Sequence, residues 1–192
     1  MRYRRSDIVE RAVGILDTYG LPDMSMRRIA AELGLQPSAL YHHFANKQVL
    51  LAAVADELLA RGARPLPDDA TWDEQVLAAS RELRDAMLAY RDGAELIATV
   101  HAFGLGALSL NGRLAAAIST GGFDAAFARS AATTILYFVF GHASDEQTHL
   151  QAGSAGAIDD EPYARAGADS FELGLTLILD GIRQRLPARA TG

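Results

Sequence analysis

The chain has 192 residues, enough for one large or two small domains with a buried core, and it contains no cysteine. The lack of cysteine excludes a disulfide framework, a thiol nucleophile and a thiolate metal site. No run approaches ~20 uninterrupted apolar residues, and no signal-type apolar run follows the basic N-terminus. We therefore expect a soluble, cytoplasmic protein with no membrane segment.

The formal net charge of −6 is unevenly distributed along the chain. Residues 1–64 hold nine Lys or Arg against seven Asp or Glu, whereas the remainder holds nine against seventeen. The first third is thus slightly basic and the rest is acidic. Only the first third is suited to lie against the phosphates of a nucleic acid.

The first predicted element is an amphipathic helix that ends at Gly20. Its apolar positions, which recur at helical spacing, are Ile8, Ala12, Ile15, Leu16 and Tyr19. Arg2, Arg4 and Arg5 precede it. These arginines suit either a DNA backbone or a solvated chain end, and the sequence leaves both readings open.

The stretch from Ser25 to Lys47 predicts two short helices joined by a tight turn. Ser25 is a typical N-cap and Gly34 a typical helix stop, and Pro37 suits a first helical position. The buried positions are Met26, Ile29, Ala30 and Leu33 in the first helix and Leu40 and Phe44 in the second. Small and polar side chains remain on the outer face of the second helix. This pattern predicts a helix-turn-helix whose second helix enters a major groove.

A further helix is expected from Asn46 to about Arg61, followed by a turn-rich segment over residues 62–70. We place a domain boundary there, with a helix-turn-helix domain at residues 1–62 and a second domain at residues 63–192. In the second domain we expect helices at about 72–90, 94–101, 114–118, 123–149 and 169–185. Loops are expected at 104–112 and 151–160. No pattern of period two occurs, so the predicted fold class is all-α.

The helices at 123–149 and 169–185 are apolar on more than one side. A helix that is apolar nearly all round is buried. One domain of this size does not cover both helices fully, so we expect a second copy of the chain to do so. The sequence therefore predicts a homodimer.

The run from Leu33 to Phe44, with Asn46 and Lys47, resembles the signature of the TetR family of bacterial transcription regulators. In the second domain, Trp72, residues 90–94 (YRDGA), 138–149 and 171–175 (FELGL) are similar to the ligand-binding domain of the tetracycline repressor type. The resemblance implies a homodimeric, one-component repressor that binds a double-stranded DNA operator and is released by a small molecule. It also implies a four-helix bundle at the dimer interface.

The resemblance assigns DNA contacts residue by residue. Arg27 would reach a base edge, and Arg28 begins the same helix beside it. The residues expected to reach phosphates are Ser25, Tyr41, His43 and Lys47. Those expected to face the bases are Gln36, Pro37, Ser38, Ala39 and His42. Arginine can donate two hydrogen bonds to a guanine edge, whereas phosphate contacts fix register without reading sequence.

The positions that hold tetracycline and its magnesium in that family carry Ala63, Ala79, Ile97 and Val100 here, so polar anchors are replaced by hydrocarbon. We therefore expect a ligand other than tetracycline, bound in a mostly apolar pocket. The predicted lining is Ala63, Ala79, Leu83, Met87, Ile97, Val100, His101, Phe103, Leu114, Thr133 and Leu136. About a third of this set is expected only to fill the core. Control by a protein partner, with no small-molecule inducer, is the competing hypothesis.

A possible metal group occurs near the end of the long helix. Its members, which share one helical face, are His142, Asp145, Glu146 and His149. The alternative is a polar end to a buried helix with His142 bonded to a carboxylate. We commit to no metal site and no cofactor, and leave this group open. No nucleophile elbow, phosphate loop or oxyanion-forming turn occurs, so no catalytic residue is assigned and no enzyme is expected.

Overall fold

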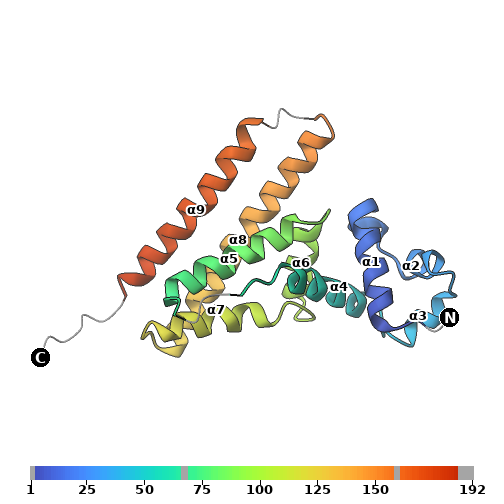
Figure 1. The fold of residues 1–192 in the computed structure, drawn as a ribbon, viewed down its shortest axis with the longest axis horizontal. Helices are drawn as coiled ribbons and strands as arrows, with labels where there is room; N and C mark the ends of the chain where they lie inside the picture. The colour runs from blue at the N-terminus through green and yellow to red at the C-terminus, as the bar shows by residue number, and fades with distance from the viewer. Residues whose placement is uncertain (1–2, 66–68, 158–160, 186–192) are drawn as a thin grey trace, which may run out of the picture. The chain divides into compact units, whose positions relative to one another are not determined.

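The computed structural model describes residues 3–65, 69–157 and 161–185, and within these ranges the chain is helical with no strand (Figure 1). The all-α prediction is confirmed. A single 3-10 turn, Leu21–Asp23, separates the first two helices. The α-helices are α1 Arg5–Tyr19, α2 Met26–Glu32, α3 Pro37–Tyr41, α4 Lys47–Gly62, α5 Trp72–Leu88, α6 Gly93–Ala102, α7 Ser109–Thr120, α8 Ala125–Ser154 and α9 Glu161–Arg183. None of these described helices is long and apolar enough to cross a membrane.

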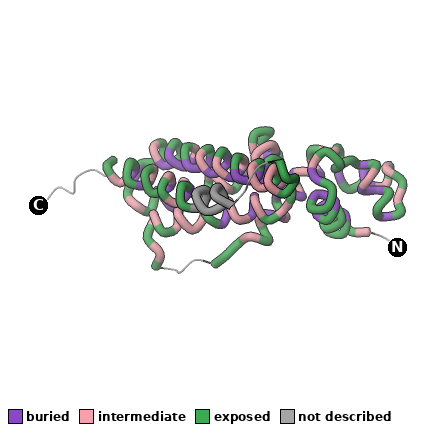
Figure 2. The backbone as a smooth tube through the Cα atoms, turned by 90° about the horizontal axis from the view of Figure 1, so that it is seen from above, coloured by how far each residue is buried: buried purple, intermediate pink, exposed green. Residues whose placement is uncertain are grey.

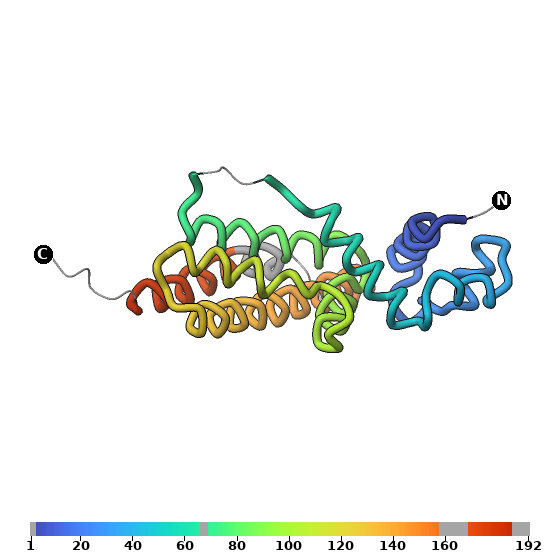
Figure 3. The backbone as a smooth tube through the Cα atoms, turned by 90° about the horizontal axis from the view of Figure 1, so that it is seen from below, coloured from blue at the N-terminus to red at the C-terminus, as the bar shows by residue number. Residues whose placement is uncertain are grey.

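The helices form two compact units (Figure 3 follows the chain by residue number). The first unit contains Met1–Ala63 and Leu83–Leu108, and the second contains Arg64–Glu82 and Ser109–Gly192. Helix α5 therefore contributes its first part to the second unit and its last turns to the first. The sequence-based boundary between residues 62 and 63 stays a prediction.

In the first unit, α1 packs against α2 and α4. Its buried residues include Ile8, Ala12, Ile15 and Leu16, as predicted. Tyr19 was expected to pack inward, but its side chain is 45% exposed. The reason is a cation–π contact: the Arg28 guanidinium lies 3.8 Å from the centre of the Tyr19 ring, so this ring sits on the surface.

Helix α6 begins at a tight corner of the first unit. Asp92 adopts a left-handed conformation (φ 55°), and its carboxylate accepts a hydrogen bond from the Leu21 N–H at 2.7 Å. A Cβ at Gly93 would lie 2.6 Å from the Met87 carbonyl oxygen, so only glycine fits this close approach. The Arg-Asp-Gly sequence thus both ends the α5 segment and ties α6 to the turn after α1.

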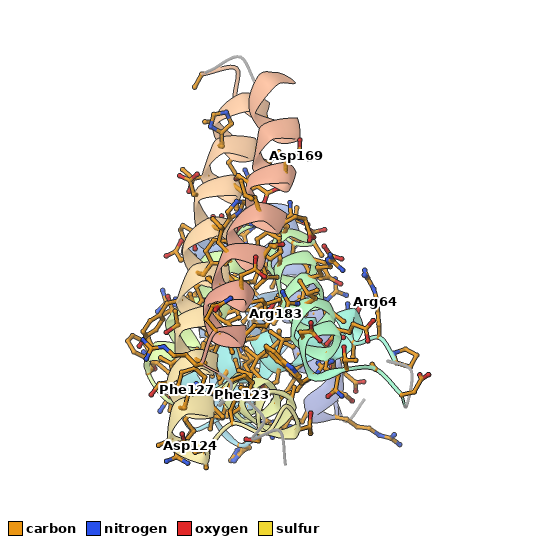
Figure 4. The ribbon with its side chains drawn as sticks, turned by 90° about the vertical axis from the view of Figure 1, so that its left-hand side faces the viewer. Arg64, Phe123, Asp124, Phe127, Asp169 and Arg183 are labelled. Carbon is orange, nitrogen blue, oxygen red and sulfur yellow. The ribbon has the colours of Figure 1, made fainter. Side chains whose placement is uncertain are left out.

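The second unit is built on α8, which packs against α7 on one side and α9 on another; α8 and α9 run side by side (Figure 1). Asp124 caps α8 by accepting hydrogen bonds from the N–H groups of Ala126 and Phe127 (Figure 4). Phe138 of α8 stacks on Phe171 of α9 with ring centroids 5.6 Å apart. Buried and exposed residues alternate along α8 and along residues 169–183 of α9; Figure 2 colours the backbone by burial.

Three predicted boundaries in the second unit are wrong. Helix α7 begins at Ser109 and not near Leu114, because the Asn111 amide bonds Thr133 of α8 at 2.8 Å and this tertiary contact outweighs the low helix propensity of Asn and Gly. Residues 151–154, predicted as loop, continue α8, since extending an existing helix costs little. Helix α9 starts at Glu161 instead of residue 169. Residues 66–68 and 158–160 of the two predicted loops lie outside the described residues.

Candidate nucleic-acid interface

The helix-turn-helix is formed by α2, a four-residue turn and α3. The Ser25 hydroxyl accepts a hydrogen bond from the Arg28 N–H at 3.1 Å, so the predicted N-cap is present. At the other end of α2, Gly34 has φ 66° and the Leu35 N–H bonds the Ala30 carbonyl at 2.8 Å. This is the pattern of a Schellman C-cap, which stops a helix and turns the chain.

Helix α3 is short, and its position depends on two buried side chains. Leu40 and Phe44 are both 0% exposed. The Arg5 guanidinium of α1 lies 4.8 Å from the centre of the Phe44 ring and covers it from outside. These contacts anchor one side of α3 within the first unit and leave the opposite side to solvent.

Most of the side chains predicted to meet DNA are open to solvent. Those exposed are Ser25, Gln36, Ser38, Tyr41, His42 and His43, and those half-buried are Pro37, Ala39 and Lys47. Tyr41 is 53% exposed although it adjoins the buried Leu40. Residues 36–43 of the predicted set thus lie on α3 or next to its ends, whereas Ser25 caps α2 and Lys47 begins α4.

The two arginines at the start of α2 differ in their exposure and in their side-chain contacts. Arg27 is exposed. Arg28 donates a hydrogen bond to the Asp23 carboxylate at 2.5 Å and stacks on the Tyr19 ring. Arg28 thus ties α2 to the preceding turn and to α1. The sequence pattern indicates neither the contact of Asp23 nor that of Tyr19 with Arg28, because both depend on how the 3-10 turn folds back.

The residues predicted to line a ligand pocket are divided between the two units. In the first unit, Leu83, Met87, Ile97 and Val100 are buried, whereas Ala63 and Phe103 are exposed. His101 is half-buried, and its Nδ1 lies 3.3 Å from the Ala107 carbonyl oxygen. In the second unit, Leu114 and Leu136 are buried, and Ala79 and Thr133 are half-buried. A ligand role for this set stays a prediction.

A polar group that sequence reasoning missed lies in the second unit. Glu82 of α5 is only 8% exposed. Its carboxylate accepts hydrogen bonds from Arg113 Nη1 at 2.5 Å, from Arg113 Nη2 at 3.2 Å and from the Arg64 N–H at 3.0 Å. Burial raises the pKa of the Glu82 carboxyl, but these hydrogen bonds and the two positive charges outweigh burial, so the net pKa is lowered. Glu82 is therefore ionised at neutral pH.

In the possible metal group near the end of α8, His142 contacts side chains of α8 and α9 instead of converging with several other ligands on one point. His142 Nε2 lies 3.0 Å from the Ser170 hydroxyl of α9, and His142 Nδ1 lies 3.7 Å from the Glu146 carboxylate. The His142 ring also meets the Phe171 ring edge-on. Among the described residues, no three His, Asp or Glu side chains converge to hold a metal ion. The polar contact between helices is the reading that the geometry supports.

A fixed α2–turn–α3 unit with an exposed polar second helix is the arrangement of a helix-turn-helix DNA-binding protein. The chain belongs to the TetR family. Residues 8–54 match the family described as "Bacterial regulatory proteins, tetR family", and residues 64–168 match "Tetracyclin repressor-like, C-terminal domain". The protein is therefore a DNA-binding transcription regulator and not an enzyme.

Individual relatives agree with this family. The tetracycline repressor protein class A from transposon 1721 of Escherichia coli is 33% identical, with 93% of this chain and 89% of the relative covered. The crystal structure of Mycobacterium smegmatis BioQ is 41% identical, with a TM-score of 0.85 over 94% of this chain and 98% of BioQ. A structure of BioQ with its natural double-stranded DNA operator is also similar, with 39% identity and a TM-score of 0.80, and it covers 94% of this chain and 98% of that one.

Proposed function

We propose that this protein is a homodimeric repressor that binds a palindromic operator and is released from it by a small, largely apolar ligand. The ligand binds more tightly to a conformation in which the two recognition helices are wrongly spaced for DNA. A ligand shifts such an equilibrium only by its difference in affinity for the two states.

The observation that carries the DNA part of the proposal is the exposed side of α3. Leu40 and Phe44 anchor the helix from beneath, while Ser38, Tyr41 and His42 are exposed. Small side chains allow close approach to base edges, and a tyrosine hydroxyl suits a phosphate oxygen. The BioQ complex with its operator supports the same use of this fold here.

The dimer is supported by large apolar side chains left on the outside of α8 and α9. Tyr137 is 68% exposed, Leu173 62% and Leu177 63%. Leu173 and Leu177 are one helical turn apart and share one face of α9. A patch of this kind on a described helix is typical of a protein–protein interface, and a second copy of the same helices would cover it.

Arg27 and Lys47 are expected to affect operator binding in different ways. We expect the dimer to select an inverted repeat from random DNA, with half-site centres about 34–36 Å apart. Arg27→Ala should relax discrimination at one base pair by ~1–3 kcal/mol. Lys47→Ala should instead weaken binding to all operator sequences to the same extent and reduce the salt dependence of that binding. Fluorescence anisotropy against single-base operator variants measures both. If Arg27→Ala lowers affinity by the same factor for every single-base operator variant, Arg27 does not read a base.

Tetracycline with magnesium should fail to release the operator. Ala63, Ala79, Ile97 and Val100 offer no hydrogen bonds to the drug–magnesium chelate, and each unmade buried bond costs ~1–3 kcal/mol. Losing several of these bonds removes most of a nanomolar affinity, which is about 12 kcal/mol. The measurement is an operator-release titration with tetracycline and magnesium, repeated with a chelator. Sub-micromolar release that the chelator abolishes would contradict this prediction.

A second candidate is control of the same DNA-binding dimer by a protein partner. It is favoured by three exposed large apolar side chains in the segment between α6 and α7: Phe103 at 63%, Leu105 at 43% and Leu108 at 62%. A ligand-controlled repressor would keep its ligand response when Leu108 is replaced by glutamate. If Leu108→Glu abolishes regulation in cells but leaves operator affinity in vitro unchanged, control by a protein partner would be favoured.

A further inference from the structure

A cavity of about 460 Å³ lies within the first unit, between α1, α4 and the segment that joins α6 to α7. Its apolar lining includes Val9 of α1, Val49 and Ala53 of α4, and Leu105 of the joining segment. Leu105 is 43% exposed, and Val49 and Ala53 are half-buried, so the cavity is open to solvent. Its volume is in the range of small-molecule sites. Its lining shares no residue with the predicted ligand pocket.

Two contacts hold the joining segment against α4 and keep one wall of the cavity in place. A Cβ at Gly106 would lie 3.1 Å from the Ala52 Cβ, so the backbone passes close to α4 there. The next residue, Ala107, is left-handed (φ 56°), and its N–H donates a hydrogen bond to Asp56 Oδ1 at 2.8 Å. Leu105 is therefore positioned beside α4 by the residues that follow it.

The two ends of the cavity carry opposite charges. Arg5 lies near the start of α4, since its guanidinium covers the ring of Phe44. Asp56 and Glu57 lie at the other end. Asp56 follows Val49 by two turns of α4, which is roughly 10 Å along the helix. A ligand that fills the cavity would therefore meet hydrocarbon between one basic and two acidic side chains.

Negative charge is in excess at the acidic end. Arg61 donates a hydrogen bond to Glu57 at 2.9 Å and also pairs with Glu10 of α1. One positive charge is thus shared by two carboxylates, and Asp56 adds a third carboxylate. Across the described parts of the chain, Asp56 accepts the Ala107 N–H and forms no ion pair with a Lys, Arg or His. This end of the cavity therefore attracts a cation.

We propose that the cavity binds a small organic cation with an apolar body. The ammonium group of the ligand pairs with Asp56, whose carboxylate has about four acceptor sites and uses one of them for Ala107. The apolar body packs against Val9, Ala53 and Leu105. The inference goes beyond the proposed function, because it adds a ligand site separate from the predicted pocket. A ligand held by both Asp56 and Leu105 stabilises the joining segment in its place on α4.

The test compares three probes that share a phenyl ring and a butyl chain: 4-phenylbutylamine, 4-phenylbutanol and 4-phenylbutyrate. Each is titrated into the purified protein by calorimetry at low ionic strength. We expect the amine to bind about three- to fivefold more tightly than the alcohol, because Asp56 is exposed and an exposed ion pair adds only modest affinity. The carboxylate should bind more weakly than both. At about 1 M salt, where the Debye length is ~3 Å, these differences should shrink.

Variants assign the preference to this cavity. Asp56→Asn removes the charge but keeps an acceptor for the Ala107 N–H, so the amine should bind no better than the alcohol. Ala53→Phe fills the cavity and should weaken the amine and the alcohol about tenfold or more. The matched control is Asp17→Asn, which makes the same change of charge on α1 at an exposed residue outside the cavity. It should leave the preference for the amine unchanged.

Hydrogen exchange of the Ala107 N–H gives a second readout. Amine at ten times its Kd should slow this exchange about tenfold, because the probe binds only while the joining segment lies on α4. No amine binding below millimolar concentration, equal affinity for amine and alcohol, or a preference that survives Asp56→Asn would overturn the proposal. Unchanged binding to Ala53→Phe, or unchanged Ala107 exchange at saturation, would show that the amine binds elsewhere and would overturn it as well.

Discussion

Replacing both Leu173 and Leu177 with glutamate should yield a monomer of about 20.5 kDa and lower operator affinity more than about a hundredfold. Both leucines are exposed on one face of α9. If a partner copy covers that face, two new carboxylates would be buried there without partners, and like charges would meet across the two-fold axis. A monomer presents one recognition helix, so the gain from binding a second half-site as part of the same complex is lost.

Light scattering at micromolar concentration measures the mass, and anisotropy on the selected operator measures the affinity. The matched control is Leu108→Glu, because Leu108 is 62% exposed like Leu173 but belongs to the first unit. The control should remain a dimer with near wild-type operator affinity. If the double variant stays dimeric, α9 does not form the subunit interface and the two-site model of DNA binding fails with it.

Phe44→Ala should lower the free energy of unfolding by about 3–5 kcal/mol. Phe44 is 0% exposed, closes the core beneath α3, and carries the Arg5 guanidinium on its outer face. Removing the ring leaves a cavity and also removes the contact that holds the start of α1 against this corner. Operator binding should fall as well, because Phe44 and Leu40 are the two fully buried side chains that hold this segment in place.

Urea denaturation at a fixed protein concentration measures this loss, since the stability of a dimer depends on concentration. Tyr41→Ala is the control: the side chain is 53% exposed on the same short helix. It should change stability by less than about 0.5 kcal/mol and still weaken DNA binding, because Tyr41 is a predicted phosphate contact and not a core residue. A loss below about 1 kcal/mol for Phe44→Ala would mean that α3 is anchored in some other way.

The helix-turn-helix could be predicted from the sequence because its signals are local. The Ser25 cap, the left-handed Gly34 and Pro37 at the first position of α3 each act within about four residues of their own place in the chain. Helical spacing also identified Leu40 and Phe44 as buried. Capping and turn chemistry depend on the nearest backbone groups, so a single sequence is enough to place them.

Helix ends were harder to predict wherever a distant contact outweighs local preference. Asn111 and Gly112 read as a loop, yet both belong to α7, which the bond from Asn111 to Thr133 holds against α8. Tyr19 has the spacing of a core residue but lies on the surface beneath Arg28. In both cases a partner brought close by folding decides the outcome, and helical spacing carries no information about it.

The sequence by itself determined the all-α class and the helix-turn-helix, because residue identity and short-range spacing suffice for both. Only the tertiary structure paired Glu82 with Arg113, Arg28 with Tyr19, and His142 with Ser170. Glu82 and Arg113 are 31 residues apart, and His142 and Ser170 are 28 apart. The sequence does not show whether a charged residue on a helix faces water or a buried partner. The packing of α5, α7, α8 and α9 decides which of the two environments each residue has.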